Sequence, residues 1–169
     1  IQATICVKNV SWDEPLPCEL LERWEKLLDG LKQVHSIAIP RCYFSNSTSC
    51  SLRGFCDASQ HAYAAVVYLR IETDGSCYSK LVVAKTRVCP LQKHSIPRLE
   101  LLGSLLLSRL LSWAHSALRV ELRLEPSICY TDSIVVLYWI KRVDKEWKQF
   151  VENRVTEIRR LAPAVWWQH

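Results

Sequence analysis

The chain has 169 residues, of which 49% are hydrophobic and 23% are charged, and its formal net charge is +5. This length suits one ordinary domain or one domain with an extension, and the composition is that of a globular protein with a buried core. No apolar run reaches the roughly 18 residues that a membrane span requires, because Glu100 and Arg109 interrupt the longest one.

The N-terminal residues are predicted to form a helical extension. Residues 1–17 are irregular and contain two prolines shortly before a helical pattern at 18–34. Apolar residues recur there every three or four positions, which predicts an amphipathic helix. The small polar cluster SNSTS at 45–49 is typical of a linker, so we place a domain boundary between 1–49 and 50–169. The apolar stripe of the helix comprises Leu20, Leu21, Trp24, Leu27, Leu28, Leu31 and Val34.

The remainder of the chain has the pattern of a mixed α/β domain. Three strand-like segments come first, and the sequence TDGS predicts a hairpin turn between the second and the third. The full order, β-β-β-α-β-α-α-β, predicts a mixed sheet covered by helices. The strands are predicted at 50–57, 63–71, 77–86, 127–132 and 164–169, and the helices at 97–118, 133–142 and 145–161.

Three acidic residues stand at the ends of these predicted core elements. Asp57 closes the first strand inside an otherwise apolar stretch, Glu100 lies one turn into the long helix, and Asp132 closes the fourth strand. An unpaired carboxylate in a core is costly, so we expect a buried Asp57 to be paired or bound to a metal ion. Strand ends and adjacent helix starts meet at one edge of an open α/β sheet, where the three carboxylates can converge.

Convergent carboxylates with few histidines favour Mg²⁺ or Mn²⁺, and a pair of such ions is a common device for phosphodiester hydrolysis. Each acid also has an explanation that involves no ligand. Asp132 could cap the helix that follows it, and Glu100 is favourable near a helix N-terminus without any function. The positive net charge favours a polyanionic partner only weakly. The eight cysteines show no metal-binding spacing, so we expect buried, reduced thiols.

Four long motifs lie in order along the second part of the chain: LRGFCDASQHAYAAVVYLR, VVAKTRVCPLQKHSIPRLELLGSLLLSRLL, CYTDSIVVLYWIKR and WKQFVENRVTEIRRLAPAVWWQH. Together they resemble the ribonuclease H region of BEL/Pao-type LTR retrotransposon polyproteins. The earlier motif SWDEPLPCELLERWEKLLDGLKQVHSIAIPRC is similar to the segment that joins reverse transcriptase to that region. Residues 1–49 would then be the connection segment and residues 50–169 the ribonuclease H-like domain.

The resemblance implies a ribonuclease H-like fold, with a mixed five-stranded sheet flanked by helices and preceded by the helical extension. Ribonucleases H use an ordered D-E-D-D set of carboxylates, and Asp57, Glu100 and Asp132 match its first three members. Integrases and transposases share the fold, but their order is Asp, Asp, Glu, so the order here favours a ribonuclease. The family's last Asp would follow WWQH, past His169, and we therefore expect a domain truncated before its last helix.

The activity that the resemblance implies is hydrolysis of the RNA strand of RNA/DNA hybrids during reverse transcription, with two Mg²⁺ or Mn²⁺ ions. Asp57 is expected to bridge both ions, Glu100 to hold the ion on the leaving-group side, and Asp132 to hold the ion that activates water. The hybrid is expected to be recognised through its backbone and 2′-hydroxyls. The expected contacts are Arg53, Ser59, Gln60, Lys85, Arg87, Lys93 and Arg98.

The resemblance also implies a partner and a location. The partner is the reverse transcriptase domain of the same polyprotein, and no membrane is expected. The location is the cytoplasmic retrotransposon particle, with nuclear access left open.

Two other functions stay open. A non-catalytic connection or scaffold domain would hold the hybrid for the polymerase without cleaving it, and a missing fourth acid fits that function. An aspartic endopeptidase is implied by the label Pao retrotransposon peptidase, under which this region is also catalogued. That chemistry needs a D-T-G or D-S-G loop, and DAS at 57–59, TDGS at 73–76 and TDS at 131–133 all lack it.

Overall fold

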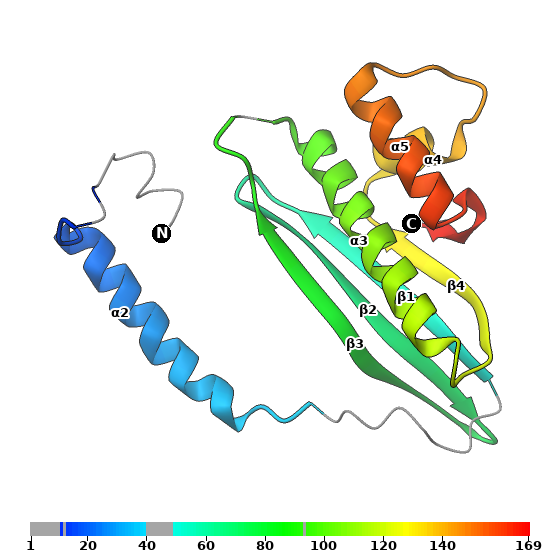
Figure 1. Ribbon diagram of the computed structural model, residues 1–169, viewed down its shortest axis with the longest axis horizontal. Helices are drawn as coiled ribbons and strands as arrows, with labels where there is room; N and C mark the ends of the chain where they lie inside the picture. The colour runs from blue at the N-terminus through cyan, green and yellow to red at the C-terminus, as the bar shows by residue number, and fades with distance from the viewer. Residues whose placement is uncertain (1–10, 12, 40–48, 93) are drawn as a thin grey trace. The chain divides into compact units, whose positions relative to one another are not determined.

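The computed structural model describes residues 11, 13–39, 49–92 and 94–169. The chain divides into two compact units, residues 1–41 and 42–169 (Figure 1). Four of the five residues of the predicted linker at 45–49 lie outside the described residues, so the linker and the boundary after residue 49 stay predictions.

The first unit contains the predicted amphipathic helix. Helix α2 spans Cys18–Lys32 and continues into the 3-10 turn η1, Gln33–Ser36. Glu19 in its first turn and Lys32 in its last turn both favour the helix through its dipole. Leu20 is buried, whereas every other member of the predicted apolar stripe is at least 40% exposed. The helix is therefore confirmed, and most of its apolar stripe faces solvent within this unit.

The second unit is built on the predicted mixed five-stranded sheet. Its strand order is β3-β2-β1-β4-β5. The first three strands form an antiparallel meander, while β4 pairs in parallel with β1 and β5 pairs in parallel with β4. Gly75 has φ of 89° and makes the predicted turn between β2 and β3, where a left-handed residue is required. The strands are β1 (Ser49–Ala58), β2 (Ala62–Thr73), β3 (Ser76–Val88), β4 (Leu124–Thr131) and β5 (Trp167–Gln168).

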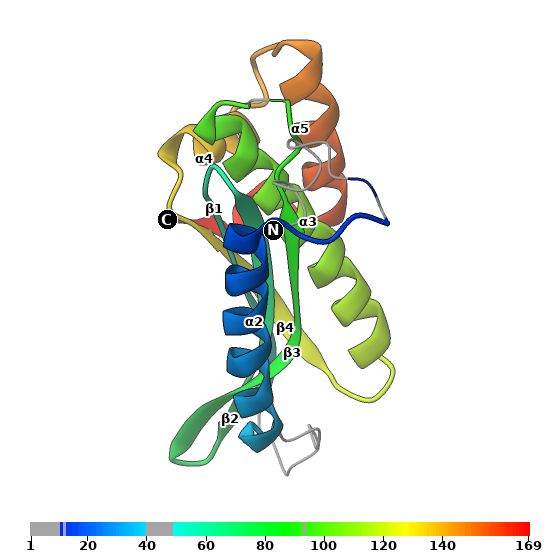
Figure 2. The same ribbon diagram turned by 90° about the vertical axis from the view of Figure 1, so that its left-hand side faces the viewer.

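Three helices accompany the sheet: α3 (Ile96–Leu118), α4 (Ile134–Lys141) and α5 (Gln149–Leu161). Helix α3 packs across β1 and β2, and α5 packs against α3 on the same side of the sheet (Figure 2). Alternate residues of the strands are buried under α3, among them Leu52 and Gly54 of β1. The residues that face α3 therefore form the core face of the sheet.

Helix α3 is the one described helix that is long and apolar enough to cross a membrane by length and composition. Half of its most apolar window is buried inside the unit, and Leu101, Leu107 and Leu111 belong to the core. The sequence statement that no such segment exists is therefore too strict, and the observed packing is that of a core helix.

Three predicted boundaries are wrong by three residues or more. Strand β4 begins at Leu124 instead of residue 127. Residues 164–166 form a 3-10 turn, η2, instead of a strand, and β5 contains only two residues. The side chain of Trp167 is fully buried and donates to the carbonyl of Ala162, which holds the chain in this turn. The helix predicted at 145–161 begins at Gln149, because Trp147 packs its ring against those of α4.

Candidate functional site

Two of the three acids come from neighbouring strand ends. β1 and β4 run in parallel, and Cys56 of β1 lies opposite Thr131 of β4. The next residue along the chain is an aspartate in both cases: Asp57 lies within β1, and Asp132 directly follows β4. Both aspartates are exposed. The register of this strand pair therefore brings the two carboxylates to the same edge of the sheet.

The third acid reaches this edge from α3. A Cβ atom at Gly103 would lie 3.3 Å from the carbonyl oxygen of Asp57, so the helix crosses close above the end of β1. Glu100 lies almost one turn earlier in α3 and is half-buried. Its Oε2 accepts a hydrogen bond of 2.6 Å from Oγ of Ser133, the residue directly after Asp132. Glu100 is thus tied to the end of β4.

The expectation that Asp57 is buried is wrong. The core face of β1 carries Leu52 and Cys56, whereas Asp57 belongs to the opposite face, together with Phe55, which is 42% exposed. Oδ1 of Asp57 accepts a hydrogen bond of 2.6 Å from the backbone N–H of Ala58. No burial cost has to be offset at Asp57, so its presence in an apolar stretch is by itself no evidence for a ligand.

The donors fit a hard divalent cation in kind, although they are not arranged around one. Asp57, Glu100 and Asp132 all supply carboxylate oxygens, which Mg²⁺ and Mn²⁺ prefer. Among the described residues, no group of three or more His, Cys, Asp or Glu side chains lies in position to hold a metal ion. One oxygen each of Asp57 and Glu100 is already engaged by a protein donor. Neither hydrogen bond engages the second oxygen of its carboxylate, so one oxygen of Asp57 and one of Glu100 are left for a cation.

The cysteine beside Asp57 is not a nucleophile. Burial raises the pKa of the Cys56 thiol to about 11, with smaller opposing effects from hydrogen bonds to Ser104 and Thr131 and a further increase from the charges of Asp132 and Asp57. A thiol with this pKa stays protonated at neutral pH and is unreactive.

The expectation that the cysteines are buried holds only in part. Cys50, Cys56 and Cys129 are buried and Cys89 is half-buried, but Cys18 and Cys77 are exposed. All six are free thiols, and Cys6 and Cys42 lie outside the described residues.

A cluster of cationic side chains surrounds Phe150 at the start of α5. The guanidinium carbons of Arg98 and Arg154 lie 4.9 Å and 3.6 Å from the centre of its ring, and the ring of His94 lies 5.6 Å away. Nε of Arg154 and Nδ1 of His94 are buried without a hydrogen-bond partner. Burial lowers the pKa of Arg154, and the charges of Arg109 and Arg98 lower it further. Arg98 and Arg154 therefore concentrate positive charge around Phe150, and Nη1 of Arg154 also donates to the backbone carbonyl of Phe150 at 2.8 Å.

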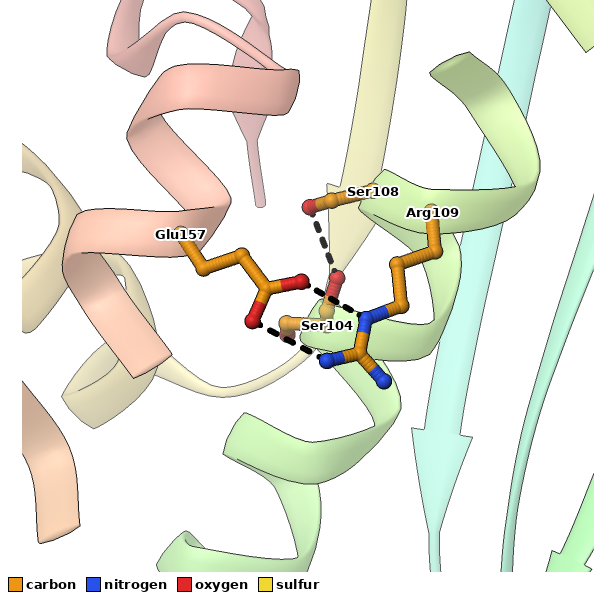
Figure 3. Close-up of polar contacts among 4 residues, drawn as sticks. All are labelled: Ser104, Ser108, Arg109 and Glu157. Carbon is orange, nitrogen blue, oxygen red and sulfur yellow. Dashed lines mark hydrogen bonds and ion pairs between the residues drawn. The ribbon is translucent and has the colours of Figure 1, made fainter. Parts of the chain in front are cut away.

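The two helices that hold this cluster are joined by an ion pair. Figure 3 shows Arg109 of α3 donating to both carboxylate oxygens of Glu157 of α5, at 2.8 Å and 3.0 Å. This hydrogen bonding lowers the pKa of Glu157. In the same view Ser108 donates to the carbonyl of Ser104 within α3, at 2.9 Å.

Two predicted nucleic-acid contacts, Ser59 and Gln60, lie in the β1–β2 turn, and the side chain of Ser59 stabilises the turn itself. Oγ of Ser59 accepts from the N–H groups of His61 and Ala62 and donates to the carbonyl of Ala62. Its hydroxyl is therefore occupied in closing the hairpin. Gln60 is exposed in the same turn.

The remaining predicted contacts are dispersed. Arg53 is half-buried on β1, and its Nε has no hydrogen-bond partner. Lys85 and Arg87 are exposed on one face of β3, the edge strand, and Lys93 lies outside the described residues. Of the predicted contacts that the structure describes, only Arg98 joins a cationic cluster.

The sequence reasoning did not single out Arg154 or Ser133. Arg154 follows Phe150 by four residues, a spacing that places the two side chains on one face of a helix. Ser133 follows a strand-end aspartate and precedes a helix, which is the position of an N-cap. Both signals were available in the sequence, although neither reveals a link to Glu100 or to His94.

Comparison with known proteins gives a family match and several structural likenesses. The family model described as "Pao retrotransposon-like RNaseH-like domain" matches residues 1–133. No curated protein matches the chain.

The solved structures are distant in sequence. The N-terminal RNase H domain of a Mycobacterium tuberculosis protein, solved as a fusion with maltose binding protein, is 13% identical with a TM-score of 0.43, over 68% of this chain and 74% of that one. RNase H1 from Halobacterium salinarum is 11% identical with a TM-score of 0.41, over 68% and 78%. The NurA nuclease from Sulfolobus solfataricus is 10% identical with a TM-score of 0.37, over 86% and 55%.

Proposed function

Because the chain belongs to the Pao retrotransposon-like RNaseH-like domain family, we propose that it hydrolyses the RNA strand of RNA/DNA hybrids as the ribonuclease H of a retrotransposon polyprotein. One observation carries the proposal. Asp57 and Asp132 end neighbouring parallel strands, and Glu100 is tied to the same edge by its hydrogen bond to Ser133. This combination matches the first three carboxylates of the D-E-D-D order.

We propose further that these three acids hold two Mg²⁺ or Mn²⁺ ions. When bound, such ions acidify the attacking water and neutralise the charge that develops on the leaving oxygen. Asp57 stands on β1, the central strand between β2 and β4, and is our candidate for the shared ligand. Glu100 and Asp132 would complete the two sites from either side.

The cationic cluster around Phe150 supports binding of a nucleic-acid backbone. Arg98 lies two residues before Glu100, so the cluster begins on the same turn of α3 as the proposed active site. Neither Arg98 nor Arg154 has an ion-pair partner among the residues that the structure describes. Residues 42–169 contain 17 Lys and Arg against 11 Asp and Glu, a net charge of +6. Phosphate contacts of this kind give affinity without sequence preference.

The test is cleavage of an RNA/DNA hybrid labelled on one strand at a time, in Mg²⁺ and in Mn²⁺. We expect cleavage of the RNA strand only, and its loss in Asp57→Asn and Asp132→Asn. Asp144→Asn is the matched control, because Asp144 is an exposed acid that contacts Arg142 at 3.8 Å in the loop after α4. Equal loss in the control variant, or cleavage that survives in Asp57→Asn, would contradict the assignment.

A hybrid-binding scaffold is the second candidate, because the described residues contain no ready metal-binding group. Hybrid binding without cleavage in either metal would favour it. Absence of both binding and cleavage would exclude the two functions together.

Organisation and location complete the proposal. Residues 1–49 would connect a reverse transcriptase domain, the proposed partner, to the ribonuclease domain at 50–169. The expected location is a cytoplasmic retrotransposon particle.

A further inference from the structure

Side chains of five residues, together with backbone groups, form a ring of hydrogen bonds that includes Glu100 and links the segments that carry the three acids. Oγ of Ser104 donates to the backbone carbonyl of Glu100 at 3.0 Å and lies 3.5 Å from Sγ of Cys56. The thiol of Cys56 donates to the backbone carbonyl of Tyr130, the residue bonded to Thr131, at 3.5 Å. The N–H of Ser133 donates to Oγ1 of Thr131 at 3.3 Å, and Oγ of Ser133 donates to Oε2 of Glu100 at 2.6 Å. The ring therefore closes on Glu100.

This ring joins the chain segments that carry the acids. Cys56 precedes Asp57, and Thr131 and Ser133 stand on either side of Asp132. Every member except Glu100 is at most 9% exposed. Hydrogen bonds that are shielded from water are directional and costly to leave unmade. The relative positions of β1, α3 and the end of β4 are thus coupled through Glu100 and through side chains that are not themselves candidate ligands.

Ser133 has the decisive place in the ring. It is the N-cap of α4, and its Oγ accepts a hydrogen bond of 3.2 Å from the N–H of Val136. A serine hydroxyl has a single proton, and here that proton is directed to the carboxylate of Glu100. A hydrogen bond to a charged acceptor is shorter and stronger than one between neutral groups. The cap of α4 therefore sets the orientation of Glu100.

We propose that Ser133 is a positioning residue, which fixes the Glu100 carboxylate beside Asp132 before any cation binds. The consequence for cleavage rests on the proposed function, whereas the fixed orientation of Glu100 does not. Ser133 leaves Oε1 of Glu100 available, so the ring prepares one carboxylate oxygen for a hard divalent cation.

The first test measures the orientation of Glu100 without activity and without metal. In protein labelled at glutamate, the two diastereotopic γ-methylene protons of Glu100 are expected to show a larger chemical-shift difference than those of an exposed glutamate, because the side chain is held in one orientation. Ser133→Ala is expected to reduce this shift difference, and Ser133→Thr, which keeps a hydroxyl and a cap, to restore it. Ser108→Ala is the matched control, since it removes a buried serine hydroxyl outside the ring. An unchanged shift difference in Ser133→Ala would overturn the proposal.

Loss of the helix cap needs its own control. Ser133→Asp keeps a good N-cap acceptor but replaces the donated proton with a second carboxylate facing Glu100. We expect this variant to retain α4 by circular dichroism and to lose the fixed orientation of Glu100. If Ser133→Asp keeps that orientation, the hydroxyl proton has no positioning role.

The second test uses cleavage. Ser133→Ala is expected to raise the Mn²⁺ concentration for half-maximal cleavage by about tenfold, the scale of an outer-shell hydrogen bond to a metal ligand. The KM for the hybrid is expected to stay unchanged, and Ser133→Thr to recover the Mn²⁺ dependence. An unchanged Mn²⁺ dependence in Ser133→Ala would refute the proposal. A wild-type chain that cleaves nothing would refute the proposed function instead, and the γ-methylene protons would then decide the positioning role alone.

Discussion

The contact between Gly54 and Leu107 gives the sharpest stability prediction. Gly54 lies on the core face of β1, and a Cβ atom there would be 2.5 Å from Cδ1 of Leu107, with Cγ and Cδ2 at 3.2 Å and 3.3 Å. Carbon atoms in good contact are about 3.5–4.0 Å apart, so Gly54→Ala forces Leu107 to move by roughly 1 Å. Leu107 is fully buried in the core and has no open side into which to move.

The expected cost follows from this overlap. Overpacking a core by one carbon typically costs about 1–3 kcal/mol, while the lower entropy of the unfolded chain with alanine returns about 0.4–1 kcal/mol. We therefore expect Gly54→Ala to lower the free energy of unfolding by about 1–2 kcal/mol. Urea denaturation followed by far-ultraviolet circular dichroism measures this change.

A double-mutant cycle isolates the cause. Leu107→Ala alone leaves a cavity and is expected to cost about 2–5 kcal/mol. In that background Gly54→Ala is expected to leave the free energy of unfolding unchanged or to raise it, because the new methyl group occupies part of the cavity. Equal effects of Gly54→Ala in both backgrounds would refute the steric explanation.

Three further predictions concern charge and reactivity. Arg154→Ala is expected to weaken hybrid binding and to reduce the salt dependence of that binding by about one counterion. Arg160→Ala is the control, because Arg160 is exposed on the same helix and lies outside the cluster. An equal loss of hybrid binding in both variants would contradict the assignment of the cluster. Hydrogen bonding to its arginine partner lowers the pKa of Glu157 in the folded state, so its contribution to the free energy of unfolding is complete above the unfolded-state pKa and is lost as the pH falls through the folded-state pKa. Denaturation between pH 7 and pH 3 is expected to show a smaller loss in Glu157→Gln. At pH 8 a thiol reagent is expected to modify exposed Cys18 and to spare Cys56, whose pKa is raised to about 11; modification of Cys56 in the folded protein would show that its burial is not maintained.

The elements of this protein follow largely from local sequence patterns. Apolar spacing predicts α2 and α3, and alternation with a glycine turn predicts the hairpin of β2 and β3. Each pattern is read over a few turns or a few alternate residues, because propensity and amphipathicity act over short distances. The sequence pattern predicts β5 too long, because the two residues of β5 become a strand only by pairing with β4, which is distant in the sequence.

The sequence by itself determined the order of elements and the three acids at the ends of core segments. Only the tertiary structure decided that Asp57 is exposed, because the side of β1 that becomes buried depends on where α3 packs. The polar ring is likewise invisible in the sequence. Its bonds join residues 33 and 48 positions apart, and such contacts exist only once the register of β1 with β4 and the crossing of α3 are both set.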